Sequence, residues 1–213
     1  MIKRALVQWT LLLALVFGGH AVAAEYEEGK QYVRLASPLP TLHKDKIEVV
    51  EFFWYGCVHC FHFEPVLQAW QATQGEDVYL IGSPAMWNDR MKIHAQAYYT
   101  AQALGVSDKL NEALFAALNT PPRPKLDNED ELAAFFAQYG VADKDFRKAF
   151  NSFGVASLVR QADARARSTA IEGTPELLVN GKYRISGGLA GGQEEMLEVA
   201  EYLIAKERAA MAN

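Results

Sequence analysis

The sequence predicts an α/β fold that is interrupted by an all-helical block. An apolar run over residues 47–53 is followed by a glycine turn, an amphipathic helix and a second short apolar run, which is the pattern of a strand–helix–strand unit. Residues 86–171 then show helical spacing without a strand signal. Residues 176–185 have the pattern of a β-hairpin, and a final helix follows them.

The composition is typical of a folded globular protein. Of the 213 residues, 50% are apolar and 11% aromatic. The chain has 21 Lys and Arg residues against 26 Asp and Glu residues, which gives a formal net charge of -5. Because no basic block occurs, the sequence argues against a nucleic-acid-binding protein.

The N-terminal segment has the three parts of an export signal. Lys3 and Arg4 are positively charged, residues 5–17 are mostly apolar, and residues 21–23 (Ala-Val-Ala) form a small-x-small cleavage motif. The apolar core is shorter than the ~20 residues of a membrane span. We therefore expect a cleaved signal peptide over residues 1–23 rather than an uncleaved anchor. The mature protein is expected to be soluble and exported to a compartment where disulfides persist.

The strand–helix–strand unit comprises a strand over residues 47–53, a helix over residues 61–72 and a strand over residues 78–81. Pro65 should kink this helix. Two strands that are joined by a helix imply a parallel, right-handed crossover. An alternating stretch at residues 32–35 predicts one further strand before the unit.

The central block is predicted to contain five helices. We expect them over residues 91–104, 108–118, 128–139, 143–151 and 155–171. Asn128 and Glu131 have the spacing of a capping box, and a glycine follows the third helix at position 140. The block therefore resembles a helical domain inserted into an α/β chain rather than an internal repeat.

The C-terminal part returns to strands. Asn180-Gly181 separates two short strand patterns and favours a type I′ hairpin turn. The last helix is expected over residues 193–210. A strand–helix–strand unit, a helical insertion, a hairpin and a closing helix together define the thioredoxin fold with an inserted all-helical domain. We assign residues 24–85 and 172–213 to the thioredoxin-like domain and residues 86–171 to the insertion.

The only two cysteines, Cys57 and Cys60, lie between the first buried strand and its helix. The first cysteine of such a turn lies at the helix N-terminus, where unpaired N–H groups and the macrodipole favour negative charge. We therefore expect a lowered pKa for Cys57 and a more buried, less reactive Cys60. A disulfide between them closes a loop worth only about 2 kcal/mol in the chain-entropy model. The pair is expected to be reactive rather than a structural staple.

The residues around the cysteines resemble those of the DsbA family of bacterial periplasmic thiol:disulfide oxidases. The resemblance rests on residues 51–60 (Glu-Phe-Phe-Trp-Tyr-Gly-Cys-Val-His-Cys), 64–65 (Glu-Pro) and 173–175 (Gly-Thr-Pro), and it covers essentially the whole mature chain. It implies that a substrate thiolate attacks Cys57, that Cys60 leaves, and that a second substrate thiolate releases the oxidised product. No organic cofactor is expected, since the disulfide is the redox group.

The resemblance also implies roles for two polar neighbours. His59 is expected to stabilise the Cys57 thiolate as an imidazolium or an N–H donor; the simpler alternative is an exposed histidine without a role. Glu51, six residues before Cys57, is expected to lie under the disulfide and to assist proton transfer at the buried cysteine. Its alternative is a solvent-facing strand residue, as we expect for Glu48.

Thr174 and Pro175 are implied to form a cis-proline loop that lies against the cysteines and binds an extended substrate chain. Without the resemblance, a trans bond is the default. Val58 departs from the best-known members, which have proline at this position. Because valine leaves an additional backbone N–H and a freer backbone, Val58 is expected to tune the redox potential.

The leading hypothesis is a monomeric periplasmic enzyme that introduces disulfides into unfolded exported proteins and is reoxidised by a membrane partner of the DsbB type. A disulfide isomerase or reductase on the same fold is the first alternative, although no room for a dimerisation domain precedes Tyr32. A Cys/His metal-binding protein is disfavoured, because a tetrahedral site needs four ligands and His59 would point elsewhere. The intact cysteine pair and the export signal disfavour a glutathione-transferase relative.

Overall fold

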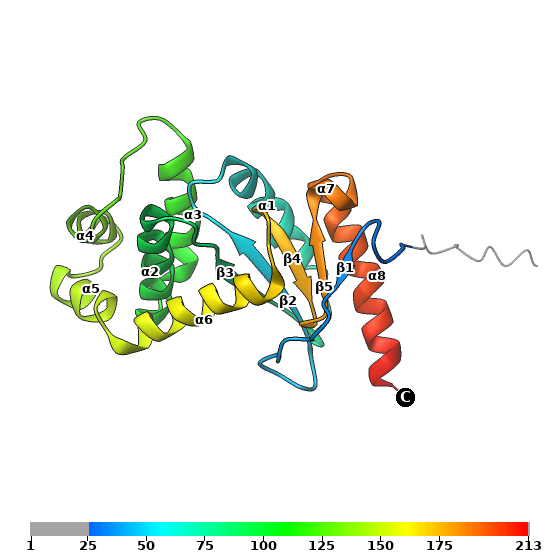
Figure 1. Cartoon of the computed structure of the whole chain (residues 1–213). Helices are drawn as coiled ribbons and strands as arrows, with labels where there is room; N and C mark the ends of the chain where they lie inside the picture. Colours follow the sequence, from blue (N-terminus) through cyan, green and yellow to red (C-terminus); the bar gives the residue numbers. More distant parts are fainter. Residues whose placement is uncertain (1–25, 213) are drawn as a thin grey trace, which may run out of the picture.

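The computed structural model describes residues 26–212, which form a five-stranded mixed sheet and eight helices (Figure 1). The strands are β1 (Val33–Arg34), β2 (Ile47–Phe53), β3 (Val78–Pro84), β4 (Glu176–Val179) and β5 (Tyr183–Ser186). The helices are α1 (Val58–Gln71), α2 (Asp89–Ala103), α3 (Ser107–Asn119), α4 (Glu129–Ala137), α5 (Asp143–Phe150), α6 (Phe153–Thr169), α7 (Gly187–Ala190) and α8 (Gln193–Met211). The predicted signal peptide lies outside the described residues.

The sheet has the strand order β1-β5-β4-β2-β3 and is covered on both faces (Figure 1). One face packs against α1 and α8 through a cluster that includes Phe63, Leu67 and Leu203. The other face packs against α6, where Ala166 contacts the cluster of Val50 and its neighbours. This three-layer arrangement confirms the predicted thioredoxin-like fold.

Strand β2 lies inside the sheet, between β4 and the edge strand β3. It pairs in parallel with β3, as the strand–helix–strand pattern predicts, and antiparallel with β4. All seven of its residues are buried, which corrects the expectation that Glu48 faces solvent. The Glu48 carboxylate accepts hydrogen bonds from the Leu42 N–H at 3.1 Å and the Tyr79 hydroxyl at 2.5 Å. These partners lie outside β2, so the pattern of apolar and polar residues along the strand could not predict them.

Helix α1 begins at Val58, directly after the first cysteine, and not at Phe61 as the apolar spacing suggested. The Cys57 side chain caps it by accepting from the Cys60 N–H. Cysteine is not among the usual capping residues, so the apolar spacing places the start of the helix three residues too late. The short helix α7 is not predicted from the sequence, because its two glycines are typical of a loop.

The hairpin between β4 and β5 has the predicted turn. Asn180 and Gly181 have φ values of 49° and 64°, the positive values that a type I′ turn needs. A Cβ at Gly181 would lie 2.2 Å from the carbonyl oxygen of Leu39. Glycine is therefore required here both for its conformation and for its small size.

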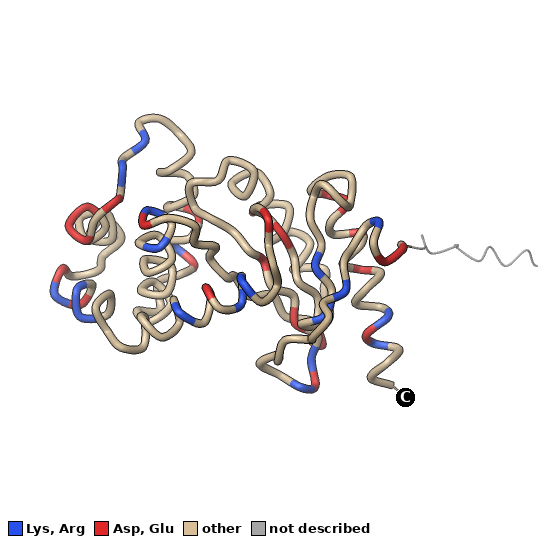
Figure 2. The backbone as a smooth tube through the Cα atoms, viewed as in Figure 1, with Lys and Arg blue, Asp and Glu red and all other residues tan. Residues whose placement is uncertain are grey.

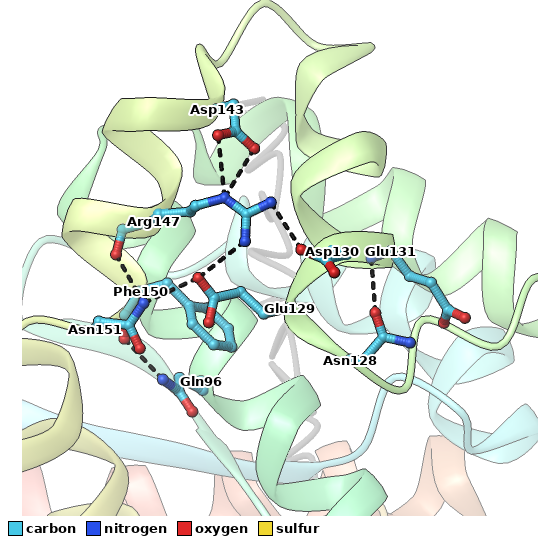
Figure 3. A network of polar contacts seen from close by, with 9 residues as sticks. All are labelled: Gln96, Asn128, Glu129, Asp130, Glu131, Asp143, Arg147, Phe150 and Asn151. Atoms are coloured by element: carbon cyan, nitrogen blue, oxygen red, sulfur yellow. Dashed lines mark hydrogen bonds and ion pairs between the residues drawn. The ribbon is translucent and has the colours of Figure 1, made fainter.

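Helices α2 to α6 lie between β3 and β4 in the sequence and form a block beside the sheet (Figure 1). Its apolar core includes Phe136 and Phe146, whose ring centroids are 4.7 Å apart. On its outer side, Arg147 pairs with Glu129 at 3.3 Å, Asp130 at 2.8 Å and Asp143 at 3.0 Å (Figure 3). The contacts with Glu129 and Asp130 join α5 to α4, whereas the contact with Asp143 lies within α5.

Charged residues of both signs are distributed over the sheet and the helical block (Figure 2). Among residues 26–212, no helix is long and apolar enough to cross a membrane.

Candidate active site

The two cysteines occupy the N-terminus of α1. Cys57 is the N-cap residue, half-buried, and its sulfur accepts from the Cys60 N–H at 3.4 Å. Cys60 lies in the first turn of the helix and is fully buried. Both cysteines are free in this structure rather than joined by a disulfide. The burial difference that the sequence predicts is therefore confirmed.

The surroundings make the two thiols chemically different. The pKa of Cys57 is lowered to about 5, first by a hydrogen bond from the Cys60 side chain and further by Thr174 and the backbone N–H groups of Cys60 and His59. Burial opposes this shift but does not cancel it. The pKa of Cys60 is raised, mainly by burial and also by its hydrogen bond to Cys57. At neutral pH Cys57 is a thiolate and Cys60 a thiol.

The loop before β4 brings Thr174 and Pro175 to the cysteines. The Thr174–Pro175 bond is cis, as the family resemblance implies. In its thiol form, Cys57 donates to the Thr174 carbonyl oxygen, 3.4 Å from its sulfur. Both loop residues and His59 line a cavity of about 380 Å³ beside the cysteines. The cis-proline loop and the active-site turn therefore border one cavity.

Val58 and His59 are both exposed. In this structure His59 lowers the pKa of Cys57 through its backbone N–H. Its carbonyl oxygen accepts from the Gln193 side chain at 2.8 Å, which joins the active-site turn to the start of α8. Gln193 carries no sequence signal, because it lies 134 residues away from His59.

Glu51 is buried in β2, with an exposed fraction of 4%. Its pKa is raised well above the usual range by burial, by the nearby Glu64 and by Cys57. One of its oxygens has no hydrogen-bond partner among the described residues. Glu51, Glu64 and Asn111 are among the residues that line a cavity of about 150 Å³. A buried carboxyl group with a raised pKa thus lies close to the cysteine pair, next to a polar cavity.

Glu64 is a second carboxyl group of this region to which the sequence assigned no role. It lies on α1 and accepts from the Asn111 side chain at 2.7 Å and the Gln68 side chain at 3.2 Å. Asn111 in turn accepts from the Tyr55 hydroxyl at 2.8 Å. Burial raises the pKa of Glu64 although these hydrogen bonds oppose the shift. The sequence feature that could have indicated a role for Glu64 is its place in the Glu-Pro pair that resembles the DsbA family.

His94, which the sequence left without a role, supports the turn from the helical block. It is 2% exposed, and its Nδ1 accepts from the Trp54 indole N–H at 3.1 Å. Its Nε2 lies 3.1 Å from the Leu126 carbonyl oxygen, so the neutral Nε2–H tautomer satisfies both contacts. Burial, followed by the charge of Arg90, lowers the pKa of His94 to about 4. Within residues 26–212, no group of three His, Cys, Asp or Glu side chains could hold a metal ion.

A thioredoxin-like sheet, a thiolate at a helix N-terminus and a buried partner thiol beside a proline loop define a dithiol oxidoreductase. The family model of the DSBA-like thioredoxin domain matches residues 83–201. The thiol:disulfide interchange protein DsbA of Pseudomonas aeruginosa is 41% identical over 200 residues, 94% of each chain. The chain therefore belongs to the DsbA family and is a thiol:disulfide oxidoreductase of the kind that introduces disulfide bonds.

Solved structures agree with this assignment. The crystal structure of Pseudomonas aeruginosa DsbA matches with a TM-score of 0.84 and 40% identity, covering 88% of this chain and 97% of that chain. The oxidoreductase DsbA from Xylella fastidiosa matches with a TM-score of 0.81 and 37% identity, covering 86% of this chain and 98% of that chain. The similarity thus includes the thioredoxin-like part and the helical block together.

Proposed function

We propose that the chain introduces disulfides into newly exported proteins in the periplasm and that a membrane oxidase of the DsbB type reoxidises it. The observation that carries the proposal is the opposite direction of the two thiol pKa shifts. Stabilising the Cys57 thiolate stabilises the reduced enzyme and makes its disulfide a stronger oxidant. A low pKa also makes Cys57 a good leaving group.

The reaction proceeds in two exchanges. A substrate thiolate attacks the Cys57 sulfur, the Cys57–Cys60 bond breaks, and Cys60 leaves with the electron pair and takes up a proton. A second substrate thiolate then attacks the substrate sulfur of the mixed disulfide, and Cys57 leaves as a thiolate. Two substrate thiols are oxidised to a disulfide, and the enzyme disulfide is reduced to a thiolate and a thiol.

Glu51 supplies the proton that Cys60 takes up. Burial raises the pKa of Glu51 well above its usual range, which favours the protonated carboxyl group. A negative charge on Glu51 raises the pKa of Cys60, so the two groups are close enough to interact. The polar cavity that Glu51 shares with Glu64 gives the carboxyl group a place to regain a proton. General acid–base catalysis is efficient when the pKa lies near the operating pH.

Thr174 and Pro175 bind the substrate backbone. Their position beside Cys57 and their shared cavity with His59 support this role. An extended chain that lies along this loop uses main-chain hydrogen bonds, which depend little on the side chains of the substrate. Such binding suits an enzyme that acts on many unfolded proteins.

The test is the redox equilibrium of the residues that follow the signal peptide against glutathione, with trapping of free thiols. An oxidase should have a disulfide that is much more easily reduced than that of thioredoxin. An equilibrium close to that of thioredoxin contradicts the proposal and favours a reductase or isomerase. Reoxidation by membranes with and without a DsbB-type protein tests the partner, and Cys57→Ser is the inactive control for both measurements.

A further inference from the structure

Glu176 is a buried charged residue that the mechanism above does not use. It is the first residue of β4 and directly follows Pro175. Its exposed fraction is 2%, although it carries a carboxyl group. Buried charges are costly unless they are paired and hydrogen-bonded, so the contacts of this residue need an explanation.

One oxygen of Glu176 binds the backbone of the loop that precedes it. Oε1 accepts from the N–H of Glu172 at 2.9 Å and from the N–H of Gly173 at 2.9 Å. Two consecutive amide groups of the loop are thus held by a single carboxylate oxygen. Because Gly173 is bonded directly to Thr174, this contact restricts the position of the residue that meets Cys57.

The other oxygen of Glu176 faces Arg184. Arg184 lies on β5, is 8% exposed, and its Nη1 is 3.6 Å from Glu176 Oε2. The same guanidinium group donates to the carbonyl oxygen of Ala170. Ala170 is the C-cap of α6 and the first residue of the connection to β4. The buried pair of Glu176 and Arg184 therefore holds both the beginning and the middle of this loop.

The end of the loop is the part that touches the redox centre. The Thr174 carbonyl oxygen lies 3.4 Å from the Cys57 sulfur, and a hydrogen bond from Thr174 contributes to lowering the pKa of Cys57. A shift of the loop would change both contacts without any change in the cysteines. The carboxyl group of Glu176 itself is directed to the loop backbone and to Arg184.

We propose that Glu176, together with Arg184, is a positioning residue that fixes Thr174 against Cys57 and thereby sets the oxidising strength of the cysteine pair. This inference rests on the proposed function, since it assumes that the Thr174 contact matters for the reaction. It assigns the effect to the two hydrogen bonds of Oε1 rather than to the negative charge. The competing explanation is a buried ion pair that only stabilises the fold.

The test compares four variants in the otherwise unchanged protein. Glu176→Ala removes the contacts to the loop, and Glu176→Asp withdraws the carboxylate by one methylene group while keeping the charge. Glu176→Gln keeps an oxygen at the position of Oε1. Glu207→Ala is the matched control, because Glu207 is also buried, at 3% exposure, but binds Asn180 and Lys182 in the hairpin turn.

Two properties are measured on the folded proteins: the pH titration of the Cys57 thiolate by its ultraviolet absorbance, and the equilibrium constant with glutathione. We expect Glu176→Ala and Glu176→Asp to raise the pKa of Cys57. The equilibrium constant with glutathione should shift roughly two- to tenfold toward a weaker oxidant, which is the effect of losing the one hydrogen bond from Thr174 to Cys57. Glu176→Gln and Glu207→Ala should remain close to the wild-type values, although both lower the thermal midpoint.

Three results would overturn the inference. The first is an unchanged thiolate titration in both Glu176→Ala and Glu176→Asp, which would leave only a role in stability. The second is an equal shift in Glu207→Ala, which would show a general effect of destabilisation. The third is a shift in Glu176→Gln as large as in Glu176→Ala, which would assign the effect to charge. The proposed function is decided separately, by the wild-type equilibrium alone.

Discussion

The sulfur of Cys57 lies 3.4 Å from the carbonyl oxygen of Thr174, a residue 117 positions later in the chain. The whole helical block, α2 to α6, is inserted between them. The contact forms because β2 and β4 are antiparallel neighbours, so the C-terminal end of β2 meets the N-terminal end of β4. The redox centre is therefore assembled from the two sequence segments that flank the insertion.

The stability of the reduced protein should depend on pH through Cys57. Its pKa is about 5 in the folded protein and about 8.5 in an unfolded chain. A lowered folded-state pKa gives stability that is fully present above the unfolded value and is lost as the pH falls toward 5. We expect the thermal midpoint of the reduced protein to rise between pH 5 and pH 8. The same scan of reduced Cys57→Ala should lack this rise; a parallel curve would contradict the thiolate assignment.

Val58→Pro should leave the thiolate largely intact. The backbone N–H groups that lower the pKa of Cys57 belong to His59 and Cys60, and not to Val58. Proline is also tolerated at the first position of a helix. We expect a change in the Cys57 pKa below about one unit and a gain in stability of about 0.4–1 kcal/mol from the stiffer unfolded chain. Thiolate titration and thermal unfolding measure both; a large rise in the pKa would show that the Val58 N–H is needed.

Glu51→Gln should separate the stability effect of Glu51 from its role in catalysis. Because the folded pKa of Glu51 is raised above its usual 4.5, its contribution to stability is lost as the pH rises through the folded value. The variant should therefore gain stability relative to the wild type with increasing pH. Its exchange rate should fall on the order of a hundredfold, the usual contribution of a general acid. Stopped-flow kinetics across a pH series test this, and an unchanged rate would remove Glu51 from the mechanism.

His94→Phe should remove the loss of stability that His94 causes when the pH falls. The pKa of His94 is about 4 in the folded protein and 6.5 in the usual range, so the wild type loses stability as the pH falls between these values. The variant loses the Trp54 hydrogen bond and should be less stable at pH 7 by roughly 1–3 kcal/mol. Denaturant unfolding at several pH values measures the difference. It should shrink toward pH 4; a constant difference would argue against a neutral buried histidine.

The sequence by itself determined the fold class and the chemistry. Strand, helix and turn patterns are local properties, so β2, the hairpin at Asn180-Gly181 and the five helices of the insertion were predictable to within a few residues. The two cysteines are close in the chain, and their position at a helix N-terminus follows from the same local pattern. The asymmetry between Cys57 and Cys60 could therefore be predicted without the structure.

Only the tertiary structure decided which polar side chains are buried and what they bind. Glu48, Glu51 and Glu176 are all buried, but their contacts differ. Glu48 binds a tyrosine hydroxyl and Glu176 holds a loop backbone, whereas one oxygen of Glu51 and one of Glu176 have no hydrogen-bond partner among the described residues. Their partners come from distant segments, and the burial of a charge depends on those partners rather than on its own strand. Spacing along the chain determines the elements, whereas the packing of distant elements determines the environment of each charge.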